Sequence, residues 1–153
     1  YTICIFDEIA ILFSCGGIFM NLFKHNIIIS ERRDMVKITD TVKKDVKESG
    51  IKNGIVVVHC PHTTAGLTIN ENADPDVIQD MLYAMEKAYP TKDIRYRHYE
   101  GNSHAHVKAS TMGASVTLIL EEGEIILGVW QDLYLCEFDG PRQRTFYVKV
   151  MEG

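Results

Sequence analysis

The sequence predicts an α+β fold in a single domain, with a large mixed or antiparallel β-sheet and about three helices. Three observations support this prediction. Short apolar runs typical of strands dominate the chain, three helical patterns lie irregularly between them, and turn sequences separate the last strands. The length of 153 residues and the 46% content of hydrophobic residues suit one domain with its own core.

Three segments show a helical pattern. The most regular one begins with Asp74 as N-cap and Pro75 at the first helical position, carries an apolar stripe from Val77 to Met85, and ends at Pro90. Each of the other two is short and is followed by a glycine that can stop a helix. One is expected to be capped by Thr39 or Asp40 and stopped by Gly50, and the other to be capped by Asn102 or Ser103 and stopped by Gly113.

The remaining apolar segments predict strands. The β-branched run Ile55–Val58 is continuous, which is typical of a strand covered on both faces. Two strands are expected around the charged turn Ser30–Asp34. Further strands are expected at 63–70, 115–120, 125–131, 134–138 and 145–150, with turns at 121–123 and 139–141.

Charge and composition exclude several functional classes. The net charge of -5 at pH 7 argues against broad binding to nucleic acid or to anionic membranes, so an anionic ligand must be held locally. The 4 cysteines form no C-x-x-C pair, which favours reduced thiols in a cytosolic protein. No apolar run after residue 20 has the ~20 residues needed to cross a bilayer.

Residues 1–19 form an atypical N-terminal extension to a domain that spans residues 20–153. The extension is rich in Ile, Phe and Leu, but Asp7 and Glu8 interrupt it and no basic residue precedes Lys24. It therefore lacks the ordered regions of a signal peptide. We interpret it as sequence foreign to the domain before Met20, and the alternative is an added edge strand or an oligomer contact.

Two polar segments carry five histidines that are candidates for ligand binding. In the first segment, His59 and His62 would point to opposite faces of a straight strand because their spacing is odd, and Pro61 blocks further regular pairing. In the second, His104 and His106 would lie about 200° apart on a helix, so only one can face a pocket. We choose His106 because Ser110, one turn later, shares its face.

We expect His62, His98 and His106 to belong to one pocket, since Thr, Asn and Glu residues accompany them. For His25, His59 and His104 we prefer a surface or hydrogen-bonded role. Glu71 and Asn72 either orient the imidazoles or cap the following helix. Trp130 taken alone is typical of a core residue.

Arg142 and Arg144 are alternate residues near the C-terminus. On a strand they would share one face and form a small cationic patch suited to phosphate. Ion pairing with Glu137 or Asp139 is the alternative.

Taken together, these segments resemble the YjbQ-like family, described as secondary thiamine-phosphate synthases. The matching strings run in family order from about Met20 to the end of the chain. They are His62-Thr63-Thr64-Ala65-Gly66, Asn70-Glu71-Asn72-Ala73-Asp74, His98 with Glu100-Gly101-Asn102, Ala105-His106, Gly128 with Trp130-Gln131, and Glu137-Phe138-Asp139-Gly140-Pro141-Arg142. Residues 1–19 have no family counterpart, and His104 stands where a smaller or acidic residue is expected.

The resemblance implies an α+β domain that assembles as a homotrimer. It also implies a transferase that joins hydroxymethylpyrimidine diphosphate to thiazole phosphate and releases diphosphate. The residues implied as catalytic are His62, Glu71 and Arg142, and those implied to bind the small phosphorylated substrate are Thr63, Thr64, Asn70, Asn102, Ser110, Trp130, Gln131 and Arg144.

A divalent metal is expected at His62, His98 and His106. Magnesium favours oxygen ligands, whereas a histidine cluster favours zinc, iron or manganese, so the identity of the metal stays open. Two alternatives to the transferase are a metal-dependent hydrolase of a small substrate and a non-catalytic metal- or ligand-binding protein.

Overall fold

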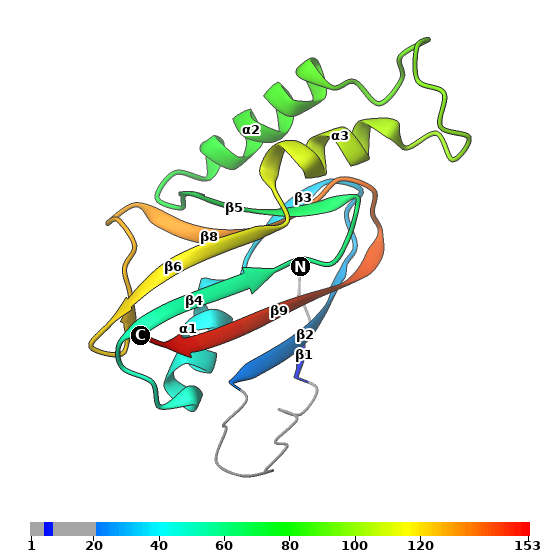
Figure 1. The fold of residues 1–153 in the computed structure, drawn as a ribbon. Coiled ribbons are helices and arrows are strands. Elements are labelled where there is room, and N and C mark those ends of the chain that lie inside the picture. Colours follow the sequence, from blue (N-terminus) through cyan, green and yellow to red (C-terminus); the bar gives the residue numbers. More distant parts are fainter. Residues whose placement is uncertain (1–4, 8–20) are drawn as a thin grey trace.

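The computed structural model describes residues 5–7 and 21–153, which form twelve helices and strands (Figure 1). Their order is β1 (Ile5–Asp7), β2 (Leu22–Ile29), β3 (Asp34–Lys37), α1 (Thr39–Ser49), β4 (Gly54–His59), β5 (Ala65–Glu71), α2 (Pro75–Ala88), α3 (Ser103–Met112), β6 (Ser115–Glu121), β7 (Glu124–Ile125), β8 (Gln131–Glu137) and β9 (Arg142–Glu152). The predicted α+β class with three helices is confirmed for this part of the chain.

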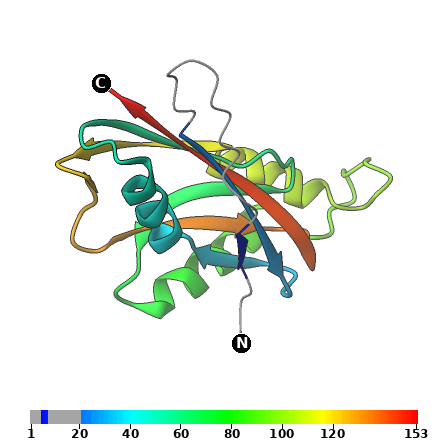
Figure 2. The same cartoon turned by 90° about the horizontal axis from the view of Figure 1, so that it is seen from below.

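The strands form two antiparallel sheets. The larger sheet has the order β1-β2-β9-β4-β6-β7 and the smaller one the order β3-β8-β5. Helices α2 and α3 cover the side of the smaller sheet that faces away from the larger one, and α1 closes one end of the space between the sheets (Figures 1 and 2). The fold therefore has three layers, and the main core lies between the two sheets.

Two clusters of buried side chains hold these layers together. The main cluster joins both sheets and α1 through residues such as Ile27, Val42, Val56, Leu135 and Phe146. The second cluster joins the smaller sheet to α2 and α3, with Met35, Ala105, Ala109, Tyr134, Cys136 and Phe138 buried and Ile78, Met81, Leu82, Met85 and Met112 packed against them. The apolar stripe predicted for α2 thus faces the smaller sheet.

Strand β4 differs from the prediction of a strand covered on both faces. Val56 and Val58 are fully buried, whereas Ile55 keeps 40% of its surface exposed. An antiparallel sheet can be packed on one face only, and the outer face of the larger sheet is not covered by the described part of the chain. Ile119, the partner of Ile55 on β6, is likewise 59% exposed.

The predicted strand at 125–131 is wrong. Only Glu124 and Ile125 pair as β7, and the chain then forms a loop that leads into β8. The side chain of Gln131 accepts a hydrogen bond from the Gly128 N–H at 2.8 Å, and the Gln131 N–H donates back to the Gly128 carbonyl at 2.9 Å. This reciprocal pair closes a tight loop where the periodicity suggested a strand, and it leaves Trp130 64% exposed.

The helix boundaries were mostly predicted, whereas the N-cap of α1 was not. Asp74 caps α2 and accepts from the Asp76 N–H at 2.9 Å, as expected. Helix α1 instead begins after Ile38 without a side-chain cap, and the Thr39 hydroxyl accepts from the Leu133 N–H at 2.8 Å. That bond ties α1 to β8, which local sequence could not show.

The described part of the N-terminal extension is β1. Ile5, Phe6 and Asp7 pair with Ile27, Asn26 and His25 of β2 and extend the larger sheet at its edge. This is the arrangement given by the alternative of an added edge strand. The rest of the predicted extension lies outside the described residues.

Candidate functional site

A series of polar contacts, which we call the Arg142–His106 chain, joins the loop between β8 and β9 to the start of α3. The Arg142 guanidinium donates to the Asp139 carboxylate at 2.8 Å, and the Asn102 amide donates to the same oxygen at 2.9 Å. Asn102 also donates to Glu100 at 3.4 Å. Glu100 lies 3.6 Å from Nε2 of His98, whose ring contacts the His106 ring edge-on at 5.3 Å.

The Arg142–His106 chain unites four of the predicted site residues. These four residues lie up to 44 positions apart in the sequence, and they are His98, Asn102, His106 and Arg142. Asn102 is the N-cap residue of α3 and is 7% exposed. Its amide contacts both Glu100, which lies near His98, and Asp139, in the loop that leads to Arg142. The fold brings these four residues into one series of contacts.

Asp139 is the centre of this arrangement. Burial raises the pKa of its carboxyl, but hydrogen bonds from Asn102 and Arg142 and the charges of Arg142 and Arg144 outweigh burial, and the pKa is lowered overall. The carboxylate is therefore ionised at neutral pH. It holds the exposed guanidinium of Arg142 in place through both its side chain and its backbone carbonyl.

Arg144 occupies a different environment from Arg142. It is 5% exposed and forms a bidentate ion pair with Glu137, which is completely buried. Its Nη2 also donates to the Thr64 hydroxyl at 2.8 Å. The two arginines do not form the predicted patch, because each one is in the ion pair that the sequence allowed as the alternative.

Glu137 connects the buried pair to the Arg142–His106 chain. Its Oε1 accepts from the backbone N–H groups of Phe138 at 2.9 Å and Asp139 at 2.7 Å. The buried ion pair therefore fixes the start of the loop that carries Asp139 and Arg142. In this structure Arg144 and Thr64 act on the site through Glu137.

His62 lies on the side of this cluster that faces the end of β4. Strand β4 stops at His59, so it cannot pair with the first part of β9, and Nε2 of His62 accepts from the Thr145 N–H at 2.8 Å instead. Burial lowers the pKa of His62, and the nearby charge of Arg144 lowers it further. His62 is therefore a neutral imidazole whose Nε2 lone pair is used by the backbone.

The predicted site is divided between the two ends of β5. Thr64 lies next to Ala65, which pairs with Glu137, whereas Glu71 pairs with Gln131 at the far end of the same two strands. Six residues of extended chain separate these pairs by about 20 Å. Four predicted site residues therefore lie away from the Arg142–His106 chain within one protomer, namely Asn70, Glu71, Trp130 and Gln131.

The remaining predicted binding residues have simple positions. Thr63 and Ser110 are exposed, and Asn70 donates to the Met81 sulfur at 3.1 Å. The backbone carbonyl of Glu71 accepts from the Tyr134 hydroxyl at 3.1 Å, and the side chain of Asn72 accepts from the same hydroxyl at 3.0 Å. Glu71 and Asn72 take neither of the two roles expected for them. Asp74 caps α2 instead, and among the described residues neither side chain contacts an imidazole.

A buried charged network between α2 and α3 was not predicted from the sequence. Lys108 on α3 is 0% exposed and donates to Glu86 of α2 at 2.6 Å. Glu86 also accepts from Arg33 at 2.6 Å and from Thr91. A lysine one turn after His104 carries no pattern that distinguishes it from a surface lysine, so only the packing of α2 on α3 reveals its role.

His104 was expected to be a surface or hydrogen-bonded histidine, and this is wrong. It is 1% exposed, and neither ring nitrogen has a hydrogen-bond partner among the described residues. His104 and His106 face different ways, as helical geometry predicts. His104, however, is the one that points inward, toward the packed interior near Lys108.

The expected metal triad is not assembled in the described residues. His98 and His106 lie together with Glu100 nearby, which supplies two imidazoles and one carboxylate, a donor set used by zinc, iron and manganese sites. Among the residues at 5–7 and 21–153, however, no three His, Cys, Asp or Glu side chains are placed to hold one ion. His62 would have to give up its bond to Thr145 to bind a metal through Nε2.

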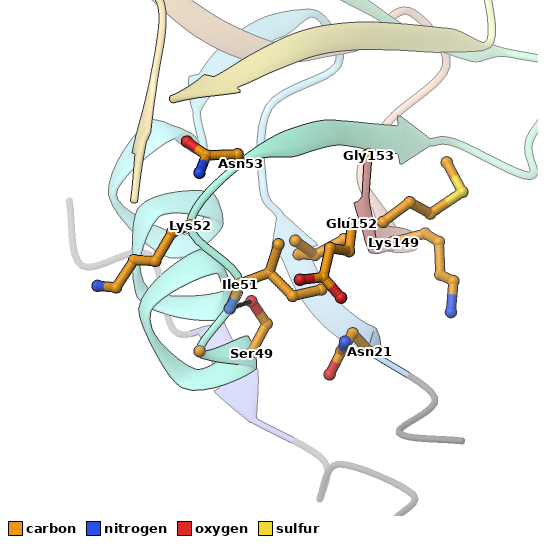
Figure 3. A pocket seen from close by; sticks show the side chains of 11 residues that line it. Asn21, Ser49, Ile51, Lys52, Asn53, Lys149, Glu152 and Gly153 are labelled. Atoms are coloured by element: carbon orange, nitrogen blue, oxygen red, sulfur yellow. Dashed lines mark hydrogen bonds between the residues drawn. The ribbon is translucent and has the colours of Figure 1, made fainter. Parts of the chain in front are cut away.

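Two cavities in the described structure lie away from these residues. One of about 690 Å³ is bounded by the end of α1, the segment 49–53 and the end of β9, with Ser49, Ile51, Asn21 and Glu152 around it (Figure 3). The other is a groove of about 420 Å³ on the opposite side of the same segment. Neither includes a residue of the predicted site. In the described part of the chain, no helix has the length and apolarity to span a membrane.

The fold and the site define an α+β domain of two antiparallel sheets, with its polar residues gathered where β4 and β8 end and β9 begins. The model of the UPF0047 protein YjbQ-like family matches residues 24–153, and the chain belongs to this family. The family predicted from the sequence is therefore confirmed.

Relatives and solved structures agree with this assignment. The UPF0047 protein YugU of Bacillus subtilis is 53% identical over 122 residues, which cover 80% of this chain and 92% of that protein. A UPF0047 protein of Methanocaldococcus jannaschii is 47% identical over 130 residues, covering 85% and 94%. The crystal structure of a YjbQ/UPF0047 family protein from Clostridium acetobutylicum matches with 51% identity and a TM-score of 0.83, covering 84% of this chain and 99% of that one. A YbjQ-like protein of unknown function from Sulfolobus solfataricus matches with 26% identity and a TM-score of 0.83, covering 99% and 100%.

Proposed function

We propose that this protein is a transferase that acts on a small phosphorylated substrate, with thiamine phosphate synthesis as the specific reaction. The Arg142–His106 chain carries the proposal. It holds a half-exposed guanidinium and two imidazoles on one connected surface, in a protein whose overall charge would otherwise repel an anion. The resemblance stated above supplies the specific substrates.

The chemical demand of the reaction is the stabilisation of growing negative charge. The bond between the pyrimidine methylene carbon and the diphosphate oxygen breaks, and the electron pair leaves with the diphosphate. The thiazole nitrogen then forms a bond to the same carbon, which gives thiamine phosphate. A cation placed beside the departing oxygen lowers the barrier, and alignment of the nitrogen with the carbon lowers it further.

We assign the first of these tasks to Arg142. Its guanidinium is held at one edge by Asp139 and is 51% exposed, so it can donate to a phosphate while its orientation is kept. The buried pair of Arg144 and Glu137 fixes the backbone of Asp139 and so positions Arg142. His98 and His106 stand at the other end of the chain as polar anchors for the substrate.

A divalent metal, a homotrimeric assembly and a small phosphorylated ligand stay part of the proposal. The candidate ligands for this metal are the imidazoles of His98 and His106 and the carboxylate of Glu100. Elemental analysis of untreated protein and light scattering of the purified protein test the metal and the trimer. The roles derived above for Arg142 and Asp139 rest on the protein's own side chains.

The test is an assay of the purified protein with hydroxymethylpyrimidine diphosphate and thiazole phosphate. We expect thiamine phosphate to form with at least one of magnesium, manganese, zinc or iron present. Arg142→Gln should lower kcat/KM by about 100-fold, as expected for a lost charge contact in a transition state. Arg95→Gln, which removes another exposed arginine paired with an aspartate, should leave kcat/KM unchanged.

Three outcomes would contradict the proposal. Absence of thiamine phosphate under every metal condition would remove the specific reaction. Release of phosphate from a single substrate, without formation of a new carbon–nitrogen bond, would favour the hydrolase alternative. Full retention of activity in Arg142→Gln would remove the role assigned to the Arg142–His106 chain.

A further inference from the structure

A second polar groove lies at the other end of the molecule, between α1 and the turn that joins β6 to β7. It encloses about 420 Å³, within the range of small-molecule sites. Strand β9 begins at Arg142 and ends near this groove, because α1 packs on β9 and β7. Eleven residues of extended chain place the groove roughly 30 Å from the candidate site.

The charge of the groove is opposite to that of the whole protein. Four lysines line it, namely Lys43, Lys44, Lys47 and Lys52, together with the two carboxylates Glu122 and Glu124. Among the residues that the structure describes, no carboxylate forms an ion pair with Lys43, Lys47 or Lys52. Lys43, Lys47 and Lys52 therefore outnumber the two glutamates and give a local surplus of positive charge on a chain with a net charge of -5.

Lys52 is held in position by its surroundings. Its carbonyl accepts from the Gly123 N–H at 2.8 Å, and its side chain runs over Gly123, where a Cβ would lie only 3.1 Å from Nζ. Figure 3 shows the Lys52 side chain pointing away from Glu152 and out of the neighbouring cavity. The ammonium group thus faces α1 and the β6–β7 turn, on the side where the other lysines lie.

Helix stabilisation explains only part of this arrangement. Lys47 lies in the last turn of α1, where a cation interacts favourably with the helix dipole. Lys43 lies more than a full turn from that end and gains little from it. Lys43 and Lys47 are four residues apart and so share one helix face, and Lys52 meets this face from outside the helix.

We propose that this groove is a second binding site, for a small and multiply charged phosphate anion. Three ammonium groups suit a chain of phosphate oxygens, which they can contact as separate point charges. The two glutamates favour a compact anion, which can bridge the lysines alone. A long polyanion is disfavoured because it would cover the carboxylates as well. The site is independent of the proposed transferase reaction.

Isothermal titration with inorganic diphosphate tests this site. The titration uses the full chain carrying Arg142→Gln, so that binding at the candidate site does not contribute. We expect one diphosphate to bind per chain, with an affinity that falls as salt rises. The triple variant Lys43→Gln, Lys47→Gln and Lys52→Gln should weaken binding at least tenfold.

A matched control makes the outcome decisive. The control triple variant Lys87→Gln, Lys92→Gln and Arg95→Gln removes the same three positive charges at exposed positions outside the groove. It should leave the affinity within about twofold, since exposed distant charges are screened. Equal weakening in this control would show a general charge effect and overturn the proposal. Unchanged affinity in the triple variant, or no binding by the parent protein, would overturn it as well.

Discussion

Arg144 and Glu137 form a buried, bidentate ion pair, and Glu137 in turn accepts from the backbone N–H of Asp139. The buried pair is thereby linked to the exposed pair of Arg142 and Asp139. Two arginines separated by a single residue therefore have different tasks. Arg144 supports the loop, and Arg142 is available to a ligand.

The two arginines should differ sharply in their effect on stability. Arg144→Met leaves Glu137 buried and unpaired, and we expect the free energy of unfolding to fall by about 3–5 kcal/mol. Arg142→Met removes a half-exposed pair and should cost less than about 1 kcal/mol. Urea unfolding followed by circular dichroism measures both. Equal losses in the two variants would contradict the division of roles.

Gly66 should be intolerant of even one added methyl group. A Cβ at this position in β5 would lie 2.9 Å from the Gly113 carbonyl oxygen and 3.0 Å from the Met112 Cβ, at the end of α3. Gly66→Ala must push α3 away from the smaller sheet, and we expect a loss of about 1–3 kcal/mol in the free energy of unfolding. Thermal unfolding checks this, and an unchanged Tm would show that α3 can shift freely.

Replacing His104 should stabilise the protein. Burial lowers the pKa of His104, with Lys108 adding to the effect, so the ring is neutral, and both of its nitrogens are buried without a partner in the described structure. His104→Leu removes this desolvation cost, and we expect a gain of about 1–3 kcal/mol in the free energy of unfolding.

A matched substitution separates this effect from general hydrophobicity. His59→Leu replaces an exposed histidine whose Nδ1 lies 2.7 Å from the Ser115 hydroxyl, and it should change stability by less than about 0.5 kcal/mol. A loss of stability in His104→Leu would mean that the buried ring has an interaction that these contacts do not include.

The ion pair of Glu86 and Lys108 should make the free energy of unfolding depend on pH in the acidic range. Burial raises the pKa of Glu86, but the hydrogen bonds from Lys108 and Thr91 outweigh it and lower the pKa from 4.5 to about 2. Because the folded pKa lies below the unfolded one, the unfolded chain binds more protons between these values. The stabilisation is present above about pH 4.5 and is lost as the pH falls toward about 2.

Urea unfolding at a series of pH values measures this dependence. The difference in stability between the wild-type protein and Glu86→Gln should be largest at neutral pH and should shrink through that acidic range. A difference that stays constant between neutral and acidic pH would show that the Glu86 carboxylate does not contribute through its charge.

Local sequence signals predicted the elements that depend on local interactions. Helix α2 is the clearest case, since its Asp74 cap, Pro75 and apolar stripe all lie within the segment itself. Strand β4 shows the limit. A continuous β-branched run fits a strand buried on one face as well as on two, and the number of covered faces depends on what else packs on the sheet.

The division of the candidate site required the tertiary structure. The sequence by itself determined the family and the α+β class, and it predicted a site that contains His98, His106, Asn102 and Arg142. Only strand pairing placed Glu71 and Gln131 at the far end of β5 from Thr64, because a residue's position along a strand is set by its register with the neighbouring strand. Only packing buried Arg144 and Lys108 while leaving Arg142 exposed, since charge and spacing are the same for a buried side chain and a solvated one.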